Sequence, residues 1–108
     1  MNEENKIPEL KDEELEKASG GLHLTSSQAK SLKYGDLLVI EDAFGLNLGE
    51  CISLGEYNDP GGIHPLQIQV RITDVYDPSG SFTLHGISYR VGNVVWLRRI
   101  DVDFPWRA

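Results

Sequence analysis

The sequence of 108 residues contains one cysteine, Cys51, and one methionine. A single cysteine excludes an intramolecular disulfide, a set of thioether rings and a multi-cysteine metal site. Because Cys51 lies in an alternating, strand-like stretch, we predict that it is a small buried apolar residue, with an intermolecular disulfide as the alternative.

The sequence also lacks long apolar runs and has few positive charges. It therefore predicts neither a transmembrane helix nor a Sec-type signal peptide. Ten Lys and Arg residues stand against 17 Asp and Glu, for a net charge of −7. Nucleic-acid phosphates and anionic lipids repel such a protein, so we expect no nucleic-acid partner and no stable membrane insertion.

Residues 1–21 carry a net charge of −4 and show helical periodicity. Leu10, Leu15 and Ala18 fall within one sector of a helical wheel, and most of the acidic residues lie on the other faces. Gly20 predicts the end of this short amphipathic helix. So short a helix is marginal in water, so we expect it to form against an apolar groove of a partner.

This segment resembles the double-glycine leaders of bacteriocin and peptide natural-product precursors. The positions that match the family pattern are Leu10, Glu14, Leu15, Gly20 and Gly21. Two positions depart from it: Lys11 stands where serine is frequent, and Ala18 where a larger aliphatic residue is usual. The resemblance implies that Leu10, Glu14, Leu15 and Ala18 are recognised by an ABC exporter with a cysteine-peptidase domain. It also implies cleavage between Gly21 and Leu22, with Gly20 in the protease cleft.

The chain after the glycines has a different character, rich in β-branched residues and turns. We predict a polar linker over residues 22–33, although Thr25 or Ser26 is a suitable cap for one helical turn. Residues 34–104 predict a small β-domain, and residues 105–108 a tail. The predicted strands are 36–41, 48–57, 66–75, 82–91 and 94–102. Gly86 predicts a bulge or corner in the fourth strand, and Gly92-Asn93 a tight hairpin.

These features predict a mainly β protein: a small five-stranded antiparallel SH3-like barrel preceded by a short amphipathic leader helix. This architecture carries no function by itself.

The ionisable residues give weak signals for chemistry. Cys51, His85 and Asp74 are residue types of a catalytic triad, but no nucleophile motif surrounds them, so we predict no enzymatic activity. His64 lies in a turn without a second ligand at helical or hairpin spacing, so we predict no metal site and no cofactor. We expect one of the adjacent arginines Arg98 and Arg99 to snorkel along the edge of the barrel, or to pair with Asp101 or Asp74 as a solvated ion pair.

Four aromatic residues are candidates for contacting a partner: Tyr57, Tyr89, Trp96 and Trp106. Small barrels often bind peptides through aromatic grooves. The leading hypothesis is an exported, bacteriocin-like or natural-product precursor that releases a small acidic β-protein, secreted to act on an extracellular protein or cell-surface target. The alternative is an intracellular SH3-like protein-binding module that retains its N-terminal helix.

Overall fold

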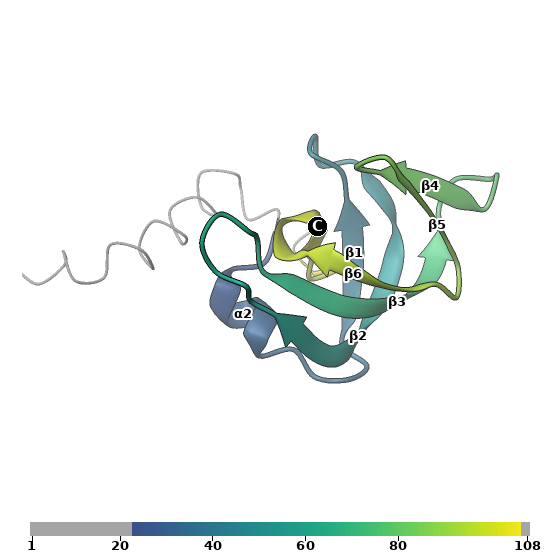
Figure 1. Cartoon of the computed structure of the whole chain (residues 1–108). Coiled ribbons are helices and arrows are strands. Elements are labelled where there is room, and N and C mark those ends of the chain that lie inside the picture. The colour runs from purple at the N-terminus through teal and green to yellow at the C-terminus, as the bar shows by residue number, and fades with distance from the viewer. Residues whose placement is uncertain (1–22, 107–108) are drawn as a thin grey trace, which may run out of the picture.

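The computed structural model describes residues 23–106, which form two antiparallel sheets and one short α-helix (Figure 1). The larger sheet has the strand order β6-β3-β2-β1-β7, and β4 and β5 form a separate hairpin. The elements are α2 (Ser26–Lys30), β1 (Leu37–Glu41), β2 (Asn47–Asn58), β3 (Gln67–Val75), β4 (Ser81–Leu84), β5 (Ile87–Arg90), β6 (Val94–Arg98), the 3-10 helix η2 (Arg99–Asp101) and β7 (Val102–Asp103). Within this part of the chain, no helix is long and apolar enough to cross a membrane.

The prediction of a mainly β fold is confirmed, but the five strands do not close into a barrel. The last strand, β7, returns to pair with β1, at Val39↔Asp103 and Ile40↔Val102. Among the described strands no ladder joins β6 to β7, so these two remain the edges of the larger sheet.

The first three strands lie where the sequence predicts them. β1 is an apolar run whose residues 38–41 are all buried, as expected of a strand covered on both sides. In β3 the alternation is confirmed: Ile68, Val70 and Ile72 are buried among more exposed polar neighbours. Cys51 is fully buried in β2, which confirms its predicted role as a core residue.

Three predictions about the C-terminal half are wrong. The predicted last strand, 94–102, is interrupted by η2: β6 ends at Arg98 and pairs with β3, and β7 pairs with β1. The predicted fourth strand, 82–91, is two strands, because the chain reverses at His85 and Gly86 to form the β4–β5 hairpin. The turn at Gly92-Asn93 does not produce a hairpin: β5 pairs with β4, and β6 pairs with β3. Asn93 N donates to Arg90 O at 3.1 Å, so the local turn forms, but it leads the chain from one sheet to the other.

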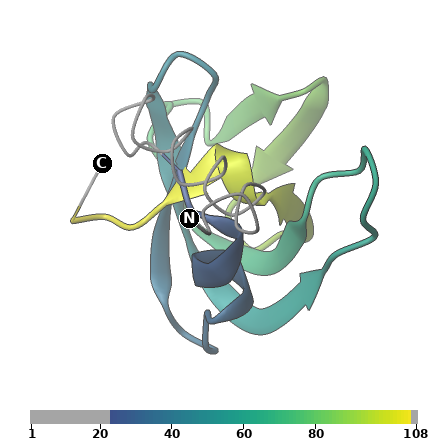
Figure 2. The ribbon, with the colours of Figure 1, turned by 90° about the vertical axis from the view of Figure 1, so that its left-hand side faces the viewer.

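The segment predicted to be a linker, residues 22–33, is part of the folded unit from Leu24 onward. Thr25 caps α2 through a capping box: its hydroxyl accepts from Gln28 N at 3.2 Å, and Gln28 Oε1 accepts from Thr25 N at 2.9 Å. Leu24 and Ala29 belong to the hydrophobic core, being 0% and 2% exposed. Figures 1 and 2 show α2 and the β4–β5 hairpin at opposite ends of the curved larger sheet.

Candidate functional site

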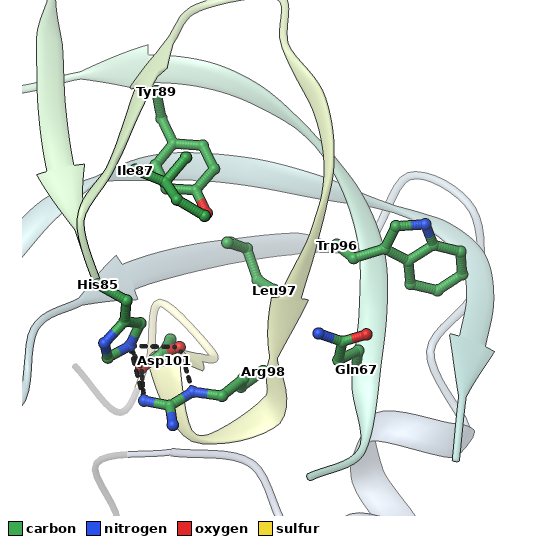
Figure 3. Close-up of a pocket in the computed structure, with 8 residues that line it drawn as sticks. All are labelled: Gln67, His85, Ile87, Tyr89, Trp96, Leu97, Arg98 and Asp101. Carbon is green, nitrogen blue, oxygen red and sulfur yellow. Dashed lines mark hydrogen bonds and ion pairs between the residues drawn. The ribbon is translucent and has the colours of Figure 1, made fainter. Parts of the chain in front are cut away.

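A groove of about 280 Å³ lies between the β4–β5 hairpin and β6 (Figure 3). We refer to it as the hairpin groove. One part of its wall is apolar or aromatic, and the other part is charged. Its lining residues are Gln67, His85, Ile87, Tyr89, Trp96, Leu97, Arg98 and Asp101.

The hairpin owes its position to a two-residue turn with an unusual backbone. His85 has φ 52° and Gly86 φ 80°, so both lie in the left-handed region. Consecutive positive φ angles match the twist of a tight hairpin. Glycine adopts this conformation freely, and histidine is among the few other residues enriched there. The turn therefore places the His85 ring at the end of the groove, beside Asp101 (Figure 3).

Three charged or ionisable side chains meet at this end of the groove. Asp101 is 4% exposed and accepts from Arg98, with Nε–Oδ2 at 3.1 Å and Nη2–Oδ1 at 3.4 Å. His85 Nε2 lies 3.1 Å from both Asp101 oxygens. The predicted pairing of an arginine with Asp101 or Asp74 is thus realised by Arg98 and Asp101. The Asp101 carboxylate is buried, so the prediction of a solvated ion pair is wrong on this point.

His85 also approaches Arg98, whose Nη2 lies 2.6 Å from His85 Nε2. One ring nitrogen can donate a hydrogen bond to Asp101 or accept one from Arg98, but it cannot do both. The proton on His85 Nε2 therefore decides which of the two partners the ring binds. The protonation of a residue in the hairpin turn thus affects the contacts made by Asp101 and Arg98 at the charged end of the groove.

The apolar wall of the groove combines buried and accessible rings. Tyr89 is 5% exposed and packs on Phe82, with ring centroids 5.4 Å apart. Burial, with a smaller contribution from Asp101, raises the pKa of Tyr89, so its phenol is neutral at physiological pH. Ile87 and Trp96 are 55% and 42% exposed, so both offer apolar area to a ligand. Trp96 lies on the far side of the groove, next to Gln67 (Figure 3).

The four aromatic candidates do not form one surface. Tyr89 and Trp96 line the hairpin groove together, but Tyr89 is a core side chain with little accessible area. Trp106, 74% exposed, stacks on Phe104 at 5.1 Å and lines a separate pocket with Asp36 and Leu37. Tyr57 is half exposed on β2, opposite Ile68, and lines neither pocket.

The structure does not assemble the residues of the possible triad. Cys51 is buried, and this burial raises the pKa of its thiol to about 12, which disfavours a thiolate nucleophile. Among the described residues, His85 Nε2 lies within hydrogen-bonding distance of Asp101 and Arg98, whereas no hydrogen bond joins His85 to Cys51 or Asp74. The described lining of the hairpin groove includes no serine, threonine or cysteine.

The described residues contain no group of three or more His, Cys, Asp or Glu side chains placed to hold a metal ion. His64 lies in the exposed loop between β2 and β3, where its backbone N donates to Gly61 O at 3.2 Å.

The leader residues Leu10, Glu14, Leu15 and Ala18, and the cleavage-site residues Gly20, Gly21 and Leu22, lie outside the described residues. No family model, curated protein or solved structure matches this chain.

Of the residues that line the groove, the sequence analysis names only Tyr89 and Trp96 as candidates for contacting a partner. It identifies neither Gln67 nor Ile87 as a binding residue, and it does not predict that Asp101 is buried. The Arg98-x-x-Asp101 spacing was the available signal, because a 3-10 turn brings residues i and i+3 to the same side.

Proposed function

We propose that this chain is an exported precursor. In this proposal, the cysteine-peptidase domain of an ABC exporter cleaves it after Gly21. The released acidic β-protein then acts outside the cell on a protein or cell-surface target. The observation that carries the proposal is the agreement of Leu10, Glu14, Leu15, Gly20 and Gly21 with the offsets of double-glycine leaders.

The described fold supports a release point at this position. Leu24 is the first described residue of the hydrophobic core, and it follows the proposed cleavage site by only three residues. Leu24 N donates to Val102 O at 3.2 Å, so the chain joins the folded unit almost at once. A cut after Gly21 would therefore leave the described core intact.

We propose that the released protein works by binding. The hairpin groove supports this role, because Ile87 and Trp96 offer accessible apolar area beside the charged cluster of His85, Arg98 and Asp101. Binding sites on proteins commonly combine aromatic or aliphatic anchors with a polar rim.

We propose further that the larger sheet is an open variant of the SH3-like barrel. The strand order β6-β3-β2-β1-β7 supports this, since the final strand returns to the first one after the single turn of η2. The β4–β5 hairpin is then an addition between the third and fourth strands of the five-strand scheme. This addition forms one wall of the hairpin groove.

Processing is tested with the precursor and the peptidase domain of an exporter from the native host. We expect Leu15→Glu to block cleavage, because the charge falls on the apolar face of the predicted helix. Asn5→Glu, which adds the same charge outside the leader motif, should be cleaved at the normal rate. Normal cleavage of the Leu15→Glu precursor would contradict docking through this face.

The binding role is tested by measuring how labelled mature protein attaches to cells or to isolated cell surfaces. Ile87→Asp should weaken attachment about tenfold or more, because it places a charge in the apolar part of the groove. Leu46→Asp, at an exposed apolar position outside this groove, serves as the matched control. Equal attachment of the two variants would exclude the hairpin groove as the contact surface.

A further inference from the structure

A second cavity, of about 260 Å³, lies beside the N-terminal end of the described chain. His23 lines it, together with three carboxylates, Glu41, Asp42 and Asp101, and one guanidinium, Arg98. The formal charge of its wall is therefore negative. We refer to it as the N-terminal cavity.

Two of the three carboxylates, those of Asp42 and Asp101, have nearby hydrogen-bond or ion-pair partners. Asp42 Oδ1 accepts from Phe44 N at 2.8 Å and from Leu46 N at 2.9 Å, which holds the loop after β1. Asp101 is held by Arg98 and His85. These contacts leave Glu41 as the carboxylate of the cavity whose charge has no counter-ion among the described contacts.

Glu41 is 3% exposed, and its Oε1 atom has no hydrogen-bond partner among the residues that the structure describes. Burial, followed by the negative charges of Asp103 and Asp42, raises the pKa of its carboxyl group. A buried ionised carboxylate is costly unless a cation or hydrogen-bond donors compensate it. Glu41 thus lines a cavity that suits a small cationic donor.

The chain itself can supply such a donor after processing. Leu24 is fixed by its bond to Val102 O and by Arg99 Nη1, which donates to Leu24 O at 2.8 Å. His23 lies on the wall of the cavity. Covalent geometry keeps the Cα atom of Leu22 within about 3.8 Å of that of His23. Cleavage after Gly21 would convert the nitrogen of Leu22 from a neutral amide into an α-ammonium group.

We propose that the N-terminal cavity binds the α-ammonium group created on Leu22, with the Glu41 carboxylate as its counter-ion. This inference rests on the proposed cleavage after Gly21. The ammonium group compensates the charge of Glu41, so the released protein is more stable than its precursor. Removal of the leader is then also a maturation step for the fold.

The test uses the full chain with residues 17–21 replaced by the enteropeptidase sequence Asp-Asp-Asp-Asp-Lys, which is cut directly before Leu22. The Tm is measured before and after cutting, in the parent protein, in Glu41→Gln and in the control Glu56→Gln, whose side chain is exposed. We expect cutting to raise the Tm of the parent and of Glu56→Gln by about 4 °C or more. The rise should be absent in Glu41→Gln. An equal rise in all three proteins would overturn the proposal.

A second measurement remains informative even if Glu41→Gln fails to fold. The pKa of the Leu22 α-amino group is followed by NMR titration of the cut parent protein. An ion pair with Glu41 should raise it by about one unit or more above the ordinary value of about 8. An ordinary value would overturn the proposal. Because an added protease makes the cut, failure here is distinct from failure of the host to cleave after Gly21.

Discussion

Asp101 is the side chain that connects the β4–β5 hairpin to the end of β6. Its buried carboxylate contacts both Arg98, at the end of β6, and His85, in the turn of the β4–β5 hairpin. Each partner is itself partly exposed, with side-chain exposures of 35% and 45%. Water can therefore solvate Arg98 and His85 in part when the carboxylate is lost, which limits the cost below that of a fully buried pair.

We expect Asp101→Asn to lower the free energy of unfolding by about 1–3 kcal/mol, because a buried charged acceptor for two partners is removed. Urea denaturation at pH 7 measures the loss. Glu56→Gln, which neutralises an exposed carboxylate, should change the stability by less than about 0.5 kcal/mol. Equal stabilities of the two variants would show that the cluster contributes nothing to the fold.

Whereas the Asp101 carboxylate is expected to stabilise the fold, the ionised carboxylate of Glu41 is expected to destabilise the uncut precursor, to an extent that depends on pH. Its raised pKa means that the folded precursor binds this proton more tightly than the unfolded chain, in which the pKa is 4.5. Stability therefore falls as the pH rises from about 4.5 through the raised pKa of the folded state. We expect the uncut precursor carrying Glu41→Gln to be more stable than wild type at pH 7. This difference should shrink toward zero below about pH 4, where both states of the wild type are protonated.

The pH dependence is measured by urea denaturation of both precursors between pH 3 and pH 8. A Glu41→Gln precursor less stable than wild type at pH 7 would mean that the ionised carboxylate is already compensated before cleavage.

At the scale of elements, α2 and the residue before its cap connect the start of the described chain to the core. Leu24 is fully buried, and Ala29 contributes the buried face of the helix. The sequence offers Thr25 or Ser26 as a helix cap, but a polar, serine-rich segment gives no local sign that Leu24 is covered by distant strands. The linker prediction failed because burial here is a property of the assembled fold.

Leu24→Ala tests whether this segment belongs to the core. We expect a loss of about 2–5 kcal/mol in the free energy of unfolding, because a buried leucine side chain is replaced by a cavity. Leu46→Ala, at a position 63% exposed, should cost less than about 0.5 kcal/mol. If Leu24→Ala were as mild as Leu46→Ala, residues 22–33 would behave as the linker that the sequence predicts.

The close pairing of β2 with β3 near Gly49 depends on the absence of a side chain at this residue. A Cβ atom built there would collide with the carbonyl oxygen of Asp74 on β3, next to a bulge at Glu50 and Cys51. We expect Gly49→Ala to cost about 1–3 kcal/mol, because the strands must separate to make room. Gly61→Ala is a useful comparison, since its Cβ would meet open space and only its positive φ opposes alanine.

Thermal unfolding of both variants measures these costs, and Gly61→Ala should lose about 1 kcal/mol. A smaller loss for Gly49→Ala than for Gly61→Ala would show that the approach to Asp74 relaxes easily.

The β4–β5 hairpin and the pairing of β6 with β3 do not follow from local sequence patterns. The sequence predicts a bulge or corner at Gly86, but the positive φ angles of both His85 and Gly86 form a turn that reverses the chain completely. A turn sequence also does not state which strand will be the partner: Gly92-Asn93 forms its turn, yet β6 pairs with β3. The hairpin groove was therefore not predictable, because it depends on how β4 and β5 lie over the end of β6.

At the scale of the whole molecule, the mainly β class and the first three strands could be predicted because apolar alternation and turn residues are local signals. Strand order, the open sheet edges and the burial of Asp101 depend on long-range pairing, which one sequence does not show. The proposed leader shares no such dependence, since its motif is read directly along the chain. The leader is thus proposed from motif positions in the sequence, whereas the hairpin groove is seen only in the structure.

Intact-mass analysis of culture supernatant and cell lysate from the native host measures whether the chain is cut after Gly21 and exported. We expect a secreted species that begins at Leu22, with the full-length precursor restricted to the lysate. Full-length protein confined to the cells would contradict it, and would leave Gly20-Gly21 as a hinge between a retained helix and an intracellular binding domain.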